Sequence, residues 1–116
     1  MLTSSCKSKG RSLCIWFRQR ILDTFGEINP HDIKVTSSGS GGEDIYLSSM
    51  VRDMLPFQFE AKNLARFVGY TYMGQAISHG PHAPVVLIKA NRQQPLVILD
   101  AEIFIKLCKE AYGGRK

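Results

Sequence analysis

The chain has 116 residues, of which 44% are hydrophobic and 22% are charged, as in an ordinary soluble domain. This length predicts one domain with one core and excludes two independent cores. The formal net charge of +5 favours an anionic partner such as nucleic acid, although charge alone is weak support for one.

Cysteine usage and hydropathy exclude several further classes of protein. The three cysteines, Cys6, Cys14 and Cys108, are widely spaced, which predicts free thiols and neither a disulfide framework nor a zinc site. No apolar run approaches the roughly 20 residues that a membrane-spanning helix needs. The N-terminal segment is basic but lacks the apolar stretch of a secretory signal. We therefore expect a cytoplasmic protein with no membrane partner.

The first predicted element is a helix over residues 12–25, which follows a polar segment at residues 1–10 that we expect to be flexible. Apolar side chains recur along this helix at helical spacing, and Gly26 ends the run. Residues 31–37 then alternate between apolar and polar side chains, as in a strand. The polar face of this strand carries Asp32, Lys34 and Thr36, and the apolar face carries Ile33 and Val35.

The next two predicted strands, residues 44–48 and 57–62, carry the polar side chains of most interest. Alternation places Asp44 on the polar face of the first strand. In the second strand it places Glu60 and Lys62 on one face, about 6–7 Å apart along the strand. If the two strands pair, Asp44 faces Glu60. The other side chains expected on these polar faces are Tyr46, Ser48 and Gln58.

The remaining elements are a helix over residues 63–78, a hairpin formed by residues 85–89 and 96–99, and a last helix. Asp100 is the expected N-cap of the last helix, and Gly113 ends it. The apolar stripe expected on this helix comprises Ile103, Phe104, Leu107, Cys108 and Ala111.

The resulting order, α-β-β-β-α-β-β-α, predicts an α/β fold. We expect a three-layer-like sandwich in which helices flank a mixed central β-sheet. It would form a single domain over residues 11–112, with a short tail at residues 113–116.

Two acids and a lysine are the residue types that phosphodiester cleavage requires. Carboxylates that hold Mg²⁺ compensate the charge of the scissile phosphate and help to activate a water molecule. Asp44 and Glu60 would bind the metal together with the backbone carbonyl of Ala61. Lys62 would orient or deprotonate the water, or pair with the phosphate. These residues predict metal-dependent cleavage of nucleic acid, with Mg²⁺ as the cofactor and Mn²⁺ able to replace it.

The same residues also have simpler interpretations. Asp44 and Glu60 can be solvated strand residues, and Lys62 alone is more often a surface lysine. His31 and the other two histidines share no metal-ligand spacing, so phosphate contact or plain solvation is favoured over metal binding.

The glycine-rich turn before Asp44, followed by Glu60-Ala61-Lys62, resembles the PD-(D/E)XK nuclease superfamily. Lys9-Gly10-Arg11 and Ser37-Ser38-Gly39-Ser40 make the chain similar to archaeal-type Holliday junction resolvases. It is also similar to small bacteriophage-encoded nucleases, whose motifs correspond here to Gly42-Glu43-Asp44-Ile45, Pro56-Phe57-Gln58-Phe59-Glu60-Ala61-Lys62-Asn63 and Gln75-Ala76.

This resemblance implies a restriction-endonuclease-like fold and a Mg²⁺-dependent endonuclease that cuts branched DNA, such as Holliday junctions, during recombination. Symmetric cleavage of a junction needs two sites, so a homodimer is expected. A bacteriophage origin would place the protein in the host cytoplasm. The resemblance assigns catalytic roles to Asp44, Glu60, Lys62 and Gln75. The basic side chains of Lys9, Arg11 and Arg66 are candidates for phosphate contacts, and the segment Ser38-Gly39-Ser40 is a further expected DNA contact.

The chain departs from the resolvase pattern at Cys14, where such enzymes carry a metal-associated glutamate on the first helix. Gln19 and Asp23 are the nearest polar candidates further along that helix. Two alternatives therefore stay open. The first is a nuclease with another DNA target, such as a nickase or a restriction- or repair-like enzyme. The second is a catalytically inactive DNA-binding or protein-interaction module with the same fold.

Overall fold

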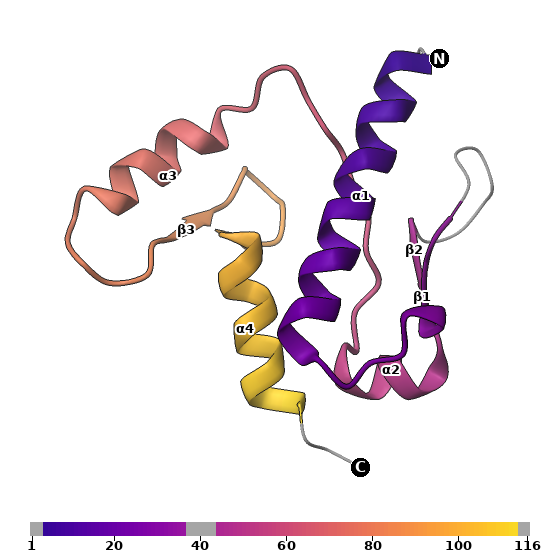
Figure 1. Ribbon diagram of the computed structural model, residues 1–116. Coiled ribbons are helices and arrows are strands. Elements are labelled where there is room, and N and C mark those ends of the chain that lie inside the picture. Colours follow the sequence, from indigo (N-terminus) through magenta and orange to yellow (C-terminus); the bar gives the residue numbers. More distant parts are fainter. Residues whose placement is uncertain (1–3, 37–43, 114–116) are drawn as a thin grey trace. The chain divides into compact units, whose positions relative to one another are not determined.

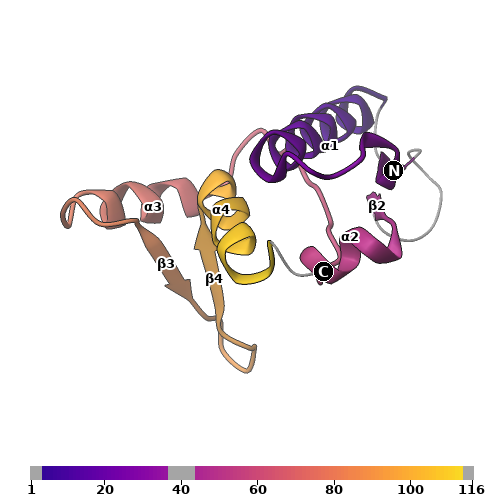
Figure 2. The ribbon, with the colours of Figure 1, turned by 60° about the horizontal axis from the view of Figure 1, so that its bottom comes forward.

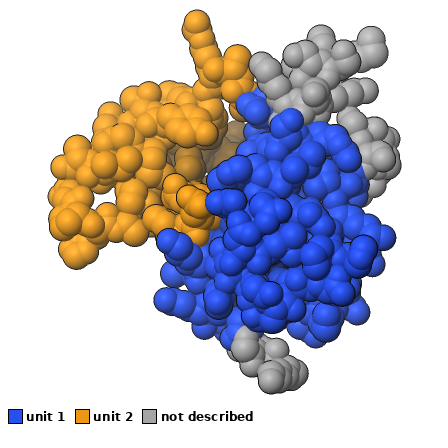
Figure 3. Space-filling view, in the orientation of Figure 1, with its two compact units in different colours: residues 1–63, 105–116 blue, residues 64–104 orange. Residues whose placement is uncertain are grey.

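The computed structural model describes residues 4–36 and 44–113, with the side chains of the first helix described from residue 10 onward. In this part of the chain, four α-helices and two small antiparallel sheets give a mixed α/β structure, as predicted (Figure 1). The chain divides into two compact units (Figure 3). The first unit comprises Met1–Asn63 with Ile105–Lys116, and the second comprises Leu64–Phe104.

The first unit is built on helix α1 (Ser4–Phe25), which contacts strand β1 (Ile33–Val35). The helix begins ahead of its predicted start, in the segment expected to be flexible, and residues 4–11 contain no proline that would break it. It ends where predicted: Gly26 has a φ of 74° and donates its N–H to the Leu22 carbonyl at 3.0 Å.

Strand β1 pairs with strand β2 (Ile45–Leu47) in an antiparallel ladder that sets Ile33 opposite Leu47. A short 3₁₀ helix, η1 (Pro30–Asp32), leads into β1. Helix α2 (Ser49–Met54) follows β2, and the Ser48 hydroxyl caps it by accepting the Val51 N–H at 3.3 Å.

The core of the first unit lies between α1 and the apolar face of the β1–β2 sheet. Ile33, Ile45 and Leu47 are at most 3% exposed, whereas Tyr46 is 49% exposed, so the predicted alternation is confirmed. Each fully buried aliphatic side chain stabilises the fold by about 1.5–3 kcal/mol. The other buried side chains of this core include Ile21, Phe25, Val51 and Leu55.

Arg18 of α1 makes hydrogen bonds to the segment that leads into the sheet. Its Nε donates to the Ile33 carbonyl and its Nη2 to the Pro30 carbonyl, both at 2.8 Å. Lys109, from the C-terminal part of the chain, donates from its Nζ to the Thr24 carbonyl at 2.9 Å. Thr24 lies at the C-terminal end of α1, where a cation is favourable. These side chains satisfy carbonyl groups that would otherwise depend on water.

No strand forms at residues 57–62, contrary to the prediction. The burial of the segment alternates as in a strand, but side chains take backbone groups that a strand ladder would pair with other backbone groups. The Phe57 carbonyl accepts from the Arg52 guanidinium, and the Ala61 N–H donates to the Asp44 carboxylate. This competition explains why the described part of the first sheet has two strands rather than three.

The second unit contains helix α3 (Gly69–Ile77) and the predicted hairpin, formed by β3 (Val85–Ile88) and β4 (Leu96–Leu99) (Figure 2). Val85 lies opposite Leu99 in this antiparallel pair. The helix is shorter than the predicted range of 63–78. It begins at Gly69, where a Cβ atom would lie 2.3 Å from the Phe67 ring, so a larger residue at this position would have to displace this half-exposed ring.

Helix α4 (Ala101–Tyr112) starts at the predicted cap, because Asp100 Oδ1 accepts the Glu102 and Ile103 N–H groups at 2.9 and 3.1 Å. Its predicted apolar stripe is wrong in part. Ile105 is buried together with Cys108, whereas Leu107 is 51% exposed. No helix in the described part of the chain is both long enough and apolar enough to cross a bilayer.

Candidate functional site

Asp44, which directly precedes β2, is hydrogen-bonded to the segment that carries Glu60 and Lys62. Its N–H donates to the Phe59 carbonyl at 3.2 Å, and its Oδ2 accepts the Ala61 N–H at 2.5 Å. The carboxylate therefore lies against the peptide that joins Glu60 to Ala61. A hydrogen bond from a backbone N–H to a carboxylate is charge-assisted, so it orients Asp44 more firmly than a neutral bond would.

Glu60 and Lys62 project together from the exposed side of the same segment. Lys62 Nζ lies 3.4 Å from Glu60 Oε2, and the two side chains are 59% and 67% exposed, respectively. The neighbours on the opposite side, Phe57, Phe59 and Ala61, are half-buried. An ion pair this exposed contributes at most about 1 kcal/mol, so either partner can turn toward a ligand at little cost.

Aromatic packing holds this segment from its inner side. The Phe59 ring packs edge-on against Phe17 of α1, with centroids 5.2 Å apart, and Phe57 packs against Tyr112 of α4 at 6.2 Å. Such contacts add about 0.5–1.5 kcal/mol each beyond their buried area. The backbone that carries Glu60 and Lys62 is thus anchored, while their charged ends stay in water.

Thr36 holds Asp44 from the other side. Both the N–H and the Oγ1 hydroxyl of Thr36 donate to the Asp44 carbonyl at 3.1 Å. Arg11 Nη1 of α1 donates to the Thr36 carbonyl at 3.3 Å. The alternation of the sequence placed Thr36 on the polar face, but only the register of β1 with β2 pairs it with Asp44.

Cys14 lies near the same acids. Its side chain is 4% exposed, and burial raises the pKa of its thiol. The negative charges of Asp44 and, to a smaller extent, Glu60 raise this pKa further, whereas the positive charge of Arg11 opposes them. A neutral thiol therefore occupies the position at which the resolvase resemblance expects a carboxylate.

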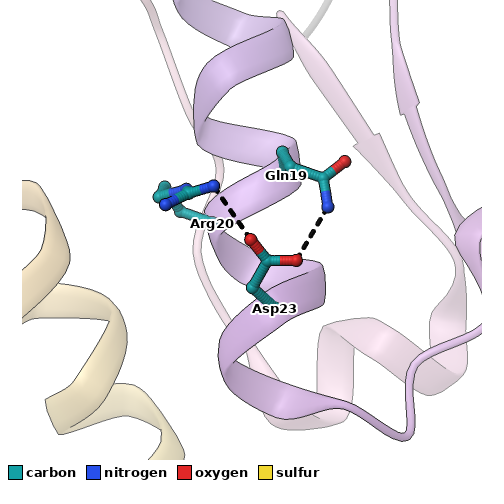
Figure 4. Close-up of polar contacts among 3 residues, drawn as sticks. All are labelled: Gln19, Arg20 and Asp23. Atoms are coloured by element: carbon teal, nitrogen blue, oxygen red, sulfur yellow. Dashed lines mark hydrogen bonds and ion pairs between the residues drawn. The ribbon is translucent and has the colours of Figure 1, made fainter.

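Gln19 and Asp23, the polar candidates further along α1, are engaged with neighbouring side chains. They bind each other on α1, where Gln19 Nε2 donates to Asp23 Oδ1 at 2.8 Å (Figure 4). Arg20 Nη2 lies 2.9 Å from Asp23 Oδ2. Both oxygens of the Asp23 carboxylate are thus engaged within the helix.

A divalent cation at Asp44 would have few protein ligands. In the described ranges, no group of three or more His, Cys, Asp or Glu side chains comes together to hold a metal. Mg²⁺ commonly needs only one or two carboxylates, because it keeps several of its waters. Asp44 and Glu60 would be these carboxylates, and the Ala61 N–H lies against Asp44.

The other residues predicted for the site do not all belong to the same unit as Asp44. Gln75 on α3 and Arg66 are exposed and belong to the second unit, whereas Arg11, like Asp44, belongs to the first. Lys9 is part of α1, but its side chain is outside the described part. The predicted DNA contacts Ser38, Gly39 and Ser40 lie outside the described residues.

Comparison with known proteins adds no family to this geometry. No protein-family model matches the chain, and neither a curated protein nor a solved structure matches it.

Proposed function

We propose that the chain is a metal-dependent endonuclease of the PD-(D/E)XK type that hydrolyses phosphodiester bonds in branched DNA. The observation that carries this proposal is the hydrogen bond from the Ala61 N–H to Asp44 Oδ2. This bond joins the acid that follows the glycine-rich segment to the Glu60-Ala61-Lys62 tripeptide, although the two are far apart in the sequence.

The residues around this bond have separate roles in the proposed reaction. Asp44, Glu60 and the Ala61 carbonyl would hold Mg²⁺, which when bound compensates phosphate charge and lowers the pKa of water. The exposed Lys62 ammonium would leave Glu60 to orient the attacking water or hold a phosphate oxygen.

Branched DNA is the substrate suggested by the resolvase resemblance, and two-fold cleavage of a junction implies a homodimer with two sites. A restriction-endonuclease-like sandwich with a mixed central sheet is the fold that this proposal implies. The second candidate function is DNA binding without catalysis. It is favoured by Cys14, because a buried thiol with a raised pKa is a poor substitute for a metal-binding carboxylate.

Cleavage assays separate these candidates. Four-way junction, nicked and linear DNA are each incubated with the protein in Mg²⁺, in Mn²⁺ and in EDTA. Paired cuts confined to the junction and abolished by EDTA support the proposal. Cleavage that ignores branching selects a nuclease with another target, and binding without cleavage in either metal selects the inactive module. Light scattering on the junction complex tests the dimer.

Glu60→Gln tests the metal-binding role directly. We expect this substitution to abolish cleavage and to preserve most of the affinity for DNA, because it removes one charge from an exposed side chain. Glu27→Gln is the matched control, since Glu27 is an exposed glutamate of the same unit. Unchanged cleavage by Glu60→Gln would remove Glu60 from the mechanism.

A further inference from the structure

The exposed face of the β1–β2 sheet carries a lysine and a tyrosine that the proposed reaction does not use. Lys34 and Tyr46 lie directly opposite each other in the register of the two strands. Both are exposed, whereas their neighbours Ile33 and Ile45 are buried on the other face. Apart from their backbone pairing in the ladder, the side chains of Lys34 and Tyr46 make no hydrogen bond or ion pair with another described residue, so both side chains are available to a ligand.

This pair lies next to the candidate metal site. The ladder continues from Lys34 and Tyr46 to Thr36 and Asp44, which are joined by the two bonds from Thr36 to the Asp44 carbonyl. Two residues along a strand correspond to about 6–7 Å. Directly opposed side chains have their Cβ atoms about 5 Å apart. A nucleic-acid strand bound at Asp44 would therefore meet Lys34 and Tyr46 within one nucleotide or two.

We propose that Lys34 and Tyr46 form a DNA-contact site beside Asp44. Lys34 binds a backbone phosphate as a point charge, and the Tyr46 ring stacks on an unpaired base adjacent to the scissile phosphate. The assignment of the scissile phosphate to Asp44 rests on the proposed function. The pairing of an aromatic ring with a cation on one open sheet face does not depend on it.

The chemistry of the pair specifies the kind of DNA that it fits. A tyrosine ring can stack on any base, because every base has a π-face, but in an intact duplex these faces are covered by neighbouring bases. Branch points and single strands present uncovered bases. The site therefore gives the protein a preference for DNA with unpaired bases over continuous duplex.

The test measures affinity for a fluorescent four-way junction, for single-stranded DNA and for duplex in EDTA, so that binding is separated from metal-dependent cleavage. Lys34→Ala should weaken binding to all three and reduce the slope of log K against log salt by about one, the effect of one lost phosphate contact. Lys106→Ala, at an exposed lysine of α4 in the same unit, should leave the slope unchanged.

Tyr46→Ala should weaken binding to the junction and to single strands by about 5- to 150-fold, the range for one lost stack, with little effect on duplex. Tyr46→Phe should bind like the wild type, because it keeps the ring. Urea unfolding of each variant confirms that it is folded. An unchanged salt slope for Lys34→Ala, or equal losses for Tyr46→Phe and Tyr46→Ala, would overturn the proposal.

The outcomes for the two proposals can be told apart. A wild-type chain that cuts junctions while the Lys34 and Tyr46 variants bind normally would retain the nuclease and reject this site. A wild-type chain that binds without cutting would reject the nuclease, and the same binding series would still decide this site. A wild-type chain that binds none of the three DNAs would overturn the site as well.

Discussion

Replacing Asp44 with alanine and with asparagine separates its structural role from its proposed chemical role. Asp44→Ala removes the acceptor of the Ala61 N–H, which is partly buried. Hydrogen bonds to charged groups contribute about 1.5–3 kcal/mol, and Asp44 is only half-buried, so we expect a loss of about 1.5 kcal/mol in the free energy of unfolding. Asp44→Asn keeps an acceptor oxygen without the charge, and it should lose about 0.5–1 kcal/mol.

Cleavage should respond differently, because an amide is a poor ligand for Mg²⁺. Both variants should be inactive, although their stabilities differ. Urea unfolding measures the midpoints at an unchanged slope, and junction cleavage in Mg²⁺ measures activity. Asp53→Ala, at an exposed aspartate of α2, should stay within about 0.5 kcal/mol of the wild type. Wild-type stability of Asp44→Ala would refute the Asp44–Ala61 bond, and wild-type cleavage by Asp44→Asn would refute the metal-binding role.

Three further predictions concern the first unit. Arg18→Met should lower the free energy of unfolding by about 2 kcal/mol, because it removes both hydrogen bonds from α1 to the carbonyls of η1 and β1. Arg20→Met should lower it by less than about 1 kcal/mol, because the ion pair of Arg20 is exposed. Iodoacetamide at pH 8 should modify Cys14 slowly in the native protein and rapidly in urea, as peptide mapping would show; equal rates would contradict its burial. Burial raises the pKa values of the Cys14 and Cys108 thiols in the folded state. Their contribution to stability is therefore complete below the ordinary thiol pKa of about 8.5 and is lost as the pH rises through the higher folded values. Urea midpoints that stay constant from pH 7.5 to 10 would oppose this prediction.

Patterns that depend on local backbone geometry were predictable from the sequence. The alternation around Ile33 and Ile45 identified both strands of the first sheet, because one face of each strand must be buried. Gly26 and Asp100 marked helix ends, because a left-handed residue ends a helix and a carboxylate caps one. The shared exposed side of Glu60 and Lys62 followed from the same alternation.

Features that depend on which partner a group finds were not predictable. Residues 57–62 have the alternation of a strand, but the Asp44 carboxylate and the Arg52 guanidinium take backbone groups that a ladder needs. The last helix buries Ile105 instead of Leu107, because the surface that it packs against, and not its composition, selects the buried face. The pairing of Thr36 with Asp44 required the strand register, which alternation alone does not give.

The two bonds from Thr36 to the Asp44 carbonyl have a consequence for how this chain tolerates change in length. They close the connection between β1 and β2 at its base, so the position of Asp44 is set by residues outside that connection. When both ends of a loop are held in place, doubling the length of the loop costs only about 0.6 kcal/mol in closure entropy. Insertions between Thr36 and Asp44 can therefore accumulate, or be engineered to carry a reporter group, while the carboxylate keeps its place against Ala61.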